Sequence, residues 1–166
     1  MSAAHVRRFV PSDTDAVTAL ILSIQRQEFD IPITKEDQPD LRDIPSFYQS
    51  GVGDFLVAED DGQVVGTIGL KDIGTGGAAL RKMFVAASHR GARHGVAQAL
   101  LDALVDLARS RAIADVWLGA TDRFVAAHRF YERNHFRRID PAARPDGFPR
   151  MAVDMRFYHR LLLPLD

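Results

Sequence analysis

The stretch from Ser88 to Leu104, SHRGARHGVAQALLDAL, holds two arginines, two histidines and two glycines directly ahead of a leucine-rich run. Apolar residues in that run recur at helical spacing, which predicts a helix that begins at the glycines. The first turn of a helix presents unpaired N–H groups and partial positive charge, and small residues there let an anion approach. Arginine can bind a phosphate through two parallel hydrogen bonds. The stretch therefore fits a phosphate cradle, and equally an ordinary strand-to-helix turn with solvated arginines.

Two common phosphate-binding motifs do not fit these glycines. A P-loop ends in Gly-Lys-Ser/Thr, which is missing here. A dinucleotide-binding loop needs Gly-x-Gly-x-x-Gly inside an early βαβ unit. Gly91 and Gly95 are instead four residues apart, and the chain begins without such a unit. The surrounding elements must therefore decide which anion the stretch would hold.

Alternating apolar residues and turn residues predict those elements. Strands are expected at residues 5–10, 55–59, 64–70, 79–86, 115–120, 136–139 and 150–161, and helices at 17–29, 35–51, 95–111 and 122–134. The resulting order, β-α-α-β-β-β-α-β-α-β-β, is neither a pure βαβ alternation nor an all-β array. The sequence thus predicts a mixed α+β sheet in a single domain over residues 1–166.

Composition excludes several classes of function. The net charge of −1 gives no general basic field, so we expect no nucleic-acid partner. The absence of cysteine excludes disulfides and a thiolate nucleophile, and the histidines have no metal-ligand spacing, so no metal is expected. The N-terminus lacks an apolar signal core and no apolar run could span a bilayer. We therefore expect a soluble, cytoplasmic protein without a membrane partner.

The segment FYERNHF, residues 130–136, resembles the FYEKNGF signature of the GNAT superfamily of acetyl-CoA-dependent N-acetyltransferases. The order and spacing of LRKMFVA, RGARHGVAQALL and DVWLGA ahead of it are similar to that family, over residues 54–139. Further segments, EDQPDL and FPRMAVDMRFY among them, resemble one bacterial subgroup nearly end to end. The resemblance implies a twisted, mixed but mostly antiparallel sheet of about seven strands with about four helices, splayed at a cofactor wedge.

The resemblance also implies a site for acetyl-CoA. It places the backbone around Met83, Phe84 and Val85 against the pantetheine arm, and the splayed strand 116–120 beside the thioester. The residues implied around the pyrophosphate are Arg90, Gly91, Ala92, Arg93, His94, Gly95, Val96 and Ala97. A backbone N–H of the strand before the loop would stabilise the oxyanion. Tyr131 would protonate the departing thiolate, since a phenol with a pKa of about 10 keeps its proton at neutral pH.

The reaction so implied is direct attack by a primary amine of a small molecule or peptide on the acetyl group, in a ternary complex. The amine must lose a proton, and the strand 79–85 carries no acid. Glu28 is the first candidate for the base, with Asp30, Glu36, Asp37 and Asp72 behind it; each also fits a solvated surface carboxylate. The acid-rich run 28–40 could attract a cationic amine. The alternative function is a non-catalytic coenzyme A-binding sensor of the same fold.

Three residues depart from the family pattern. Ala92 stands where Gln or Arg is frequent, and Phe124 stands where many relatives have Asn. His135 replaces the usual Gly, which it tolerates less well if the turn needs a positive φ. In the last strand, Phe157 and Tyr158 are expected in the core or at a dimer contact, so a homodimer is possible.

Overall fold

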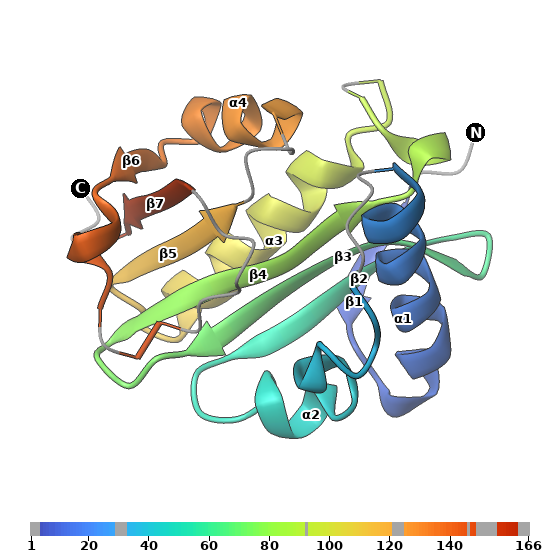
Figure 1. The fold of residues 1–166 in the computed structure, drawn as a ribbon, viewed down its shortest axis with the longest axis horizontal. Helices are drawn as coiled ribbons and strands as arrows, with labels where there is room; N and C mark the ends of the chain where they lie inside the picture. Colours follow the sequence, from blue (N-terminus) through green and yellow to red (C-terminus); the bar gives the residue numbers. More distant parts are fainter. Residues whose placement is uncertain are drawn as a thin grey trace.

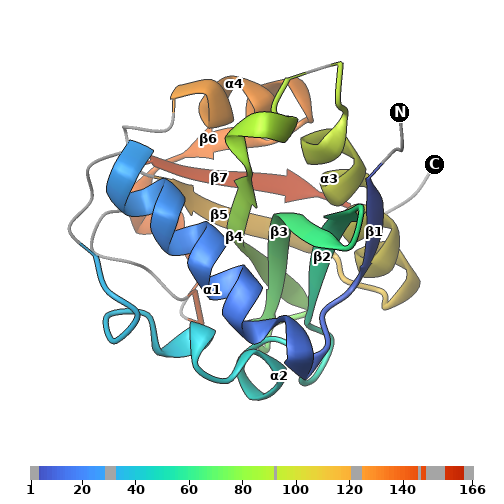
Figure 2. The same cartoon turned by 90° about the vertical axis from the view of Figure 1, so that its right-hand side faces the viewer.

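The computed structural model describes residues 4–28, 33–91, 93–120, 125–145, 147–148 and 156–162. A seven-stranded sheet runs through its centre in the order β1-β2-β3-β4-β5-β7-β6 (Figure 1). Neighbouring strands are antiparallel except β4 and β5, which are parallel. Helices α1 and α2 lie on one face of the sheet and α3 and α4 on the other (Figures 1 and 2). The mixed α+β class predicted from the element order is confirmed.

Most elements lie where the apolar patterns predict them. The strands are β1 (His5–Arg8), β2 (Asp54–Asp60), β3 (Gln63–Asp72), β4 (Gly77–Val85), β5 (Asp115–Ala120), β6 (Arg137–Ile139) and β7 (Arg156–Leu161), and the α-helices are α1 (Thr14–Ser23), α2 (Ile44–Phe47), α3 (Val96–Ser110) and α4 (Val125–Arg133). The predicted edge position of β6 is confirmed, because β6 pairs with β7 alone.

Two helix predictions need correction. The single helix expected over residues 35–51 is two short pieces, a 3₁₀ turn Pro39–Leu41 and α2, which ends at Phe47 rather than at Gly51. A proline occupies the first turn of each piece, where its missing N–H does no harm but prevents a continuous helix. The helix expected over residues 17–29 is α1 followed by a short π-helix, Ile24–Glu28. The start of the closing strand, 150–155, lies outside the described residues.

The sheet separates two apolar layers. Along β2, Phe55 and Val57 face the layer under α1 and α2, whereas Leu56 and Ala58 face the layer under α3. This alternation follows from the two-residue repeat of a strand. Phe157 and Tyr158 are 1% and 0% exposed, so the prediction that they belong to the core is confirmed. A homodimer stays a prediction.

Two irregularities in β4 shape the site. β4 pairs with β5 only from Gly77 to Leu80, so within the described residues the segment 81–85 has no strand partner on that side. In the pairing with β3, Gly69 faces Arg81 but Thr67 faces Phe84, which leaves one extra residue in β4. Lys82 in this bulge has φ +53, and its carbonyl accepts a hydrogen bond from the Thr67 hydroxyl at 2.7 Å. The sheet therefore opens between β4 and β5 directly beside a bulge.

Candidate active site

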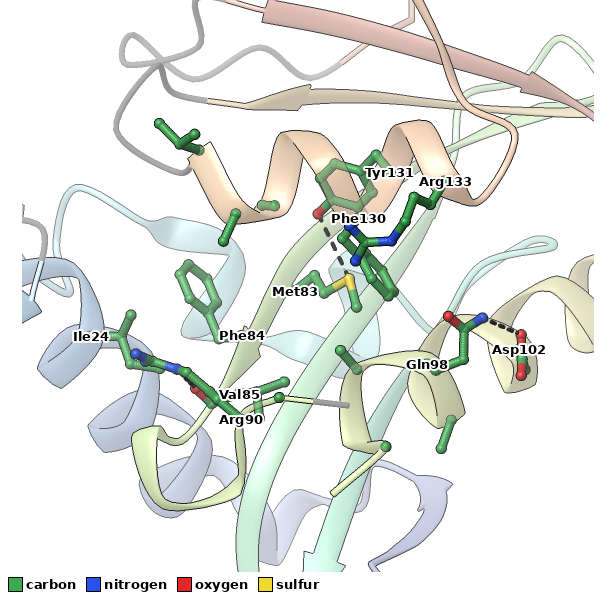
Figure 3. Close-up of a pocket in the computed structure, with 17 residues that line it drawn as sticks. Ile24, Met83, Phe84, Val85, Arg90, Gln98, Asp102, Phe130, Tyr131 and Arg133 are labelled. Atoms are coloured by element: carbon green, nitrogen blue, oxygen red, sulfur yellow. Dashed lines mark hydrogen bonds between the residues drawn. The ribbon is translucent and has the colours of Figure 1, made fainter. Parts of the chain in front are cut away.

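A cavity of about 960 Å³ lies where β4 and β5 separate, between the two helical layers (Figure 3). Its wall is mostly apolar, with a few polar side chains and two glycines. The lining residues are Ile24, Met83, Phe84, Val85, Arg90, Gly91, Gly95, Ala97, Gln98, Ala99, Asp102, Val125, Ala126, Ala127, Phe130, Tyr131 and Arg133. An apolar cleft of this size with few polar groups is typical of a site for a large organic ligand.

The structure brings most of the residues implied for acetyl-CoA to this one cavity. Those that line it are Met83, Phe84, Val85, Arg90, Gly91, Gly95, Ala97 and Tyr131. Val96 is buried in the core, so only its backbone could contact a ligand. Arg93 and His94 are exposed and do not line the cavity, and Ala92 lies outside the described residues. Phe124 also lies outside them.

The turn before α3 has the geometry that the glycines suggested. Gly91 and Gly95 have φ values of +96 and +66, which few residues other than glycine adopt without strain. A Cβ added at either position would meet no atom within 4 Å, so the backbone faces open space. Gly95 is the N-cap of α3 and, having no side chain, makes no capping hydrogen bond. The first N–H groups of α3 are therefore accessible to an anion.

Replacing Gly95 by Ala tests whether this turn holds the ligand. We expect the variant to lose about 1–2 kcal/mol of stability, because an L-residue is strained at this φ. We also expect its affinity for coenzyme A to fall about threefold to tenfold, because the new methyl group intrudes where the anion would sit. Urea unfolding and calorimetric titration with coenzyme A measure the two effects.

The matched control is Gly62→Ala in the turn between β2 and β3. Gly62 has φ +78 and equally open surroundings, but it does not line the cavity. This variant should lose similar stability and keep its affinity for coenzyme A. Equal losses of affinity in both variants would show that the Gly95 effect is not local to the cavity.

Tyr131 reaches the cavity from α4. Its side chain is 6% exposed, and its hydroxyl lies 3.7 Å from the Met83 Sδ on β4 (Figure 3). A thioether is a weak acceptor, so the hydroxyl is available to a stronger one. Burial, together with the nearby Tyr158 hydroxyl, raises the pKa of Tyr131 above its usual range. The phenol is therefore a protonated donor throughout the neutral range.

Phe130, the residue before Tyr131 on α4, also lines the cavity. The helix turns by about 100° per residue, and the cavity is wide enough to contact both rings. Phe130 is half-buried and still packs partly on the core beneath α3. Phe130 thus contacts both the core and the cavity.

Glu28 does not itself line the cavity but forms an ion pair with Arg90, which does. Arg90 also donates through Nε to the Val85 carbonyl at 2.8 Å. The pair joins the π-helix after α1 to the loop before α3, although the two residues are 62 positions apart. The candidate base and the candidate phosphate ligand thus contact each other.

The other candidate bases are engaged elsewhere or far from the cavity wall. Asp72 accepts from the backbone N–H groups of Val52 and Gly74, at 3.1 and 2.8 Å. Asp37 accepts from the Thr34 N–H and hydroxyl, both at 2.9 Å. Neither these two nor Glu36 lines the cavity, and Asp30 lies outside the described residues. Glu28 is distinguished from these three carboxylates by its ion pair with a residue of the cavity wall, Arg90.

Several residues that line the cavity were not predicted from the sequence. They come from α3, as Gln98, Ala99 and Asp102, and from α4, as Val125, Ala126, Ala127 and Arg133. Gln98 and Asn134 exchange side-chain hydrogen bonds at 2.9 and 3.3 Å, which tie α3 to the end of α4. Asn134 precedes His135, whose φ of +70 shows that this turn does require the left-handed region. Helical periodicity around Tyr131 could have indicated Ala127, one turn away.

In the part of the chain that the structure describes, no helix is long and apolar enough to cross a membrane. Within the same residues, no group of three or more His, Asp or Glu side chains could hold a metal ion.

Comparison with known proteins identifies the family. The sequence profile of the family described as Acetyltransferase (GNAT) family matches residues 19–136, which is more than half of the chain. An acetyltransferase of the GNAT family from Staphylococcus aureus Mu50 is 37% identical and superimposes with a TM-score of 0.93, over 96% of this chain and 99% of that one. The chain therefore belongs to the GNAT acetyltransferase family, as its motifs indicated.

Other relatives differ more. N-acetylaspartate synthetase of Danio rerio is 35% identical over 131 residues, which cover 72% of this chain and 45% of the relative. The chain spans less than half the length of the curated relatives it matches. The PaiA N-acetyltransferase of Thermoplasma acidophilum, solved in complex with coenzyme A, shares the fold with a TM-score of 0.72 at 17% identity, over 96% of this chain and 99% of that one.

Proposed function

We propose that this protein transfers an acetyl group from acetyl-CoA to a primary amine of a small molecule or peptide. The observation that carries the proposal is the single cavity wall that combines an open β4 edge, the uncapped N-terminus of α3 and the protonated Tyr131. Coenzyme A has a long uncharged arm and a pyrophosphate, and this wall offers matching groups to both. Family relatives that carry N-acetyltransferase names support the same reaction.

Each group in the cavity has a proposed task. The backbone of Met83 to Val85 binds the pantetheine arm, and the turn from Gly91 to Ala97 binds the phosphates. The amine nitrogen forms a bond to the acetyl carbon while the bond from that carbon to sulfur breaks. A backbone N–H of β4 stabilises the negative charge that develops on the carbonyl oxygen. Tyr131 donates its proton toward the departing sulfur.

We further propose that phosphate binding prepares Glu28 to act as the base. The Glu28 carboxylate is paired with Arg90. A phosphate group competes for the same guanidinium, because arginine binds phosphate through two parallel hydrogen bonds. The released carboxylate is then free to accept the proton that the attacking amine must lose.

The variant Glu28→Gln separates these two effects. We expect coenzyme A to bind about threefold more tightly, because Arg90 no longer has a competing anion. We expect kcat to fall about tenfold or more, because the amide cannot accept a proton. Titration with coenzyme A and turnover at saturating substrates measure the two quantities.

Glu59→Gln is the control, since Glu59 pairs with Arg7 at 3.3 Å and does not line the cavity. It removes the same charge and should change neither quantity. Tighter binding of coenzyme A with an unchanged kcat would limit Glu28 to the pair with Arg90 and move the base elsewhere.

The activity itself is tested by thiol release from acetyl-CoA across amines, polyamines, amino acids and peptides. We expect at least one acceptor class to release thiol and to yield the acetylated product by mass spectrometry. Tight binding of coenzyme A without turnover on any class would instead support the non-catalytic sensor.

A further inference from the structure

The bulge in β4 places two consecutive cationic side chains on one face of the sheet. Successive residues of a regular strand point to opposite faces, and a bulge interrupts this alternation. The Arg81 guanidinium lies over the Phe47 ring of α2, at 5.3 Å from its centre. The Lys82 ammonium donates to the Gln38 amide oxygen at 2.5 Å, between α1 and α2. Both side chains therefore extend toward the layer of α1 and α2.

The cavity reaches the same layer. Ile24 and Phe84 line the cavity and belong to the apolar cluster under α1 and α2, whereas Tyr131 belongs to the cluster on the opposite face. The opening between β4 and β5 thus connects the two faces. At about 3.3 Å per residue, Arg81 is within about 10 Å of Phe84 along the strand. A ligand that approaches the opening from the α1 and α2 side therefore passes close to Arg81.

Arg81 has no matched anion in this part of the molecule. Its half-buried side chain makes no ion pair or hydrogen bond with the described ranges of the chain. Lys71, on the neighbouring strand, lies over the same Phe47 ring at 4.7 Å and likewise has no ion pair there. Like charges on adjacent strands repel each other unless an anion lies between them.

The nearby acids do not supply that anion. Glu28 pairs with Arg90, and Asp37 accepts hydrogen bonds from Thr34. Asp40 lies 3.7 Å from the Lys82 ammonium and accepts a hydrogen bond from the Tyr48 hydroxyl at 2.5 Å. In the acid-rich run 28–40, which was expected to attract a cationic amine, these three carboxylates are already engaged. Within the described ranges, two cations over the Phe47 ring, Arg81 and Lys71, thus have no ion pair.

We propose that the acceptor is a small amino carboxylate, such as a free amino acid, and that Arg81 binds its carboxylate while its amino group faces the thioester. The proposal rests on the acetyl transfer proposed above and names the class of acceptor for it. A guanidinium on an aromatic ring keeps a fixed orientation and binds carboxylate through two parallel hydrogen bonds. Lys71 adds charge without a fixed direction.

The test compares free amino acids with their carboxamides and with polyamines, by thiol release from acetyl-CoA. We expect kcat/KM for the best free amino acid to exceed that of its carboxamide by at least about tenfold. The variant Arg81→Gln should raise KM for that amino acid about tenfold or more. It should leave kcat, the KM for acetyl-CoA and turnover of the carboxamide within about twofold.

Two further variants keep the test decisive. Arg138→Gln removes an exposed arginine from the edge strand β6 and should leave all constants unchanged. Arg81→Lys keeps the charge but cannot form two parallel hydrogen bonds to a carboxylate, so its KM should lie between those of the native protein and Arg81→Gln. An intact melting transition in both Arg81 variants shows that lost packing on Phe47 does not explain the result.

The outcomes distinguish the two proposals. Equal or better turnover of carboxamides or polyamines, with Arg81→Gln indistinguishable from the native protein, overturns the carboxylate inference and leaves acetyl transfer standing. No thiol release from any member of the panel, with coenzyme A still bound, overturns the proposed transfer and this inference together.

Discussion

Tyr131→Phe should lower kcat about 100-fold while the dissociation constant of coenzyme A changes less than about threefold. The expectation follows from where the hydroxyl lies. Its hydrogen-bond partner among the described residues is a methionine sulfur, at 3.7 Å. Removing it therefore leaves no strong partner unsatisfied, and the ring can keep its packing against Phe136 and Tyr158. The melting temperature should change by less than about 2 °C.

The pH dependence of kcat gives a second signature of the same group. Burial raises the pKa of Tyr131 above its usual range near 10, so the proton stays on the oxygen to higher pH than in an exposed tyrosine. A fall in kcat through loss of this proton should therefore begin only above about pH 10. A tyrosine-dependent fall that begins near pH 8 would contradict this assignment.

Tyr158→Phe is the control for Tyr131→Phe, because it removes a second hydroxyl from the same aromatic cluster. Tyr158 donates to the Glu132 carboxylate at 2.8 Å, and its ring centre lies 6.1 Å from that of Tyr131. This variant should lose about 1 kcal/mol of stability and retain kcat. If Tyr131→Phe keeps kcat within about threefold of the native value, Tyr131 is not the proton donor.

Local patterns in the sequence predict much of this site because the strand, the turn and the helix that form it follow one another along the chain. The apolar spacing of α3 and the glycines before it predict an uncapped helix start, and the structure has one at Gly95. The alternation of β4 predicts a strand over Met83 to Val85, and these residues do line the cavity. Such features depend on neighbours a few residues apart, which a single sequence displays.

Contacts between distant residues could not be predicted in the same way. The ion pair of Glu28 with Arg90 depends on how the π-helix after α1 packs beside the loop before α3. The bulge at Lys82 reverses the expected direction of one side chain, and no residue type in LRKMFV signals it. Reading the strand as regular would place Arg81 and Lys82 on opposite faces. The position of both cations on one face of β4 therefore became visible only with the fold.

The bulge is also tied to a buried polar network that should dominate the stability of the acceptor side. The Lys82 and Asp40 side chains are only 2% and 4% exposed, with 3.7 Å between the ammonium nitrogen and the carboxylate oxygen. Tyr48 donates to the same carboxylate oxygen, and burial raises the pKa of this phenol, so it remains a donor. Gln38 accepts from Lys82 and exchanges two hydrogen bonds with Gln25, at 3.1 and 2.9 Å.

Asp40→Asn should therefore destabilise the protein by about 3–5 kcal/mol, measured by urea unfolding. The amide can still accept from Tyr48, so the change is mainly the loss of the negative charge beside a buried ammonium. Removing that ammonium as well, in Asp40→Asn with Lys82→Met, should recover much of the loss, because the pair then disappears as a unit.

The exposed Asp43, which accepts from the Ser46 N–H at the start of α2, gives the matched control for Asp40→Asn. Asp43→Asn makes the same chemical change and should lose at most about 1 kcal/mol, because asparagine caps a helix nearly as well. If Asp40→Asn is no more destabilising than Asp43→Asn, the buried pair contributes little. In that case the position of Lys82, and with it the direction of Arg81, is maintained by the backbone of the bulge rather than by Asp40.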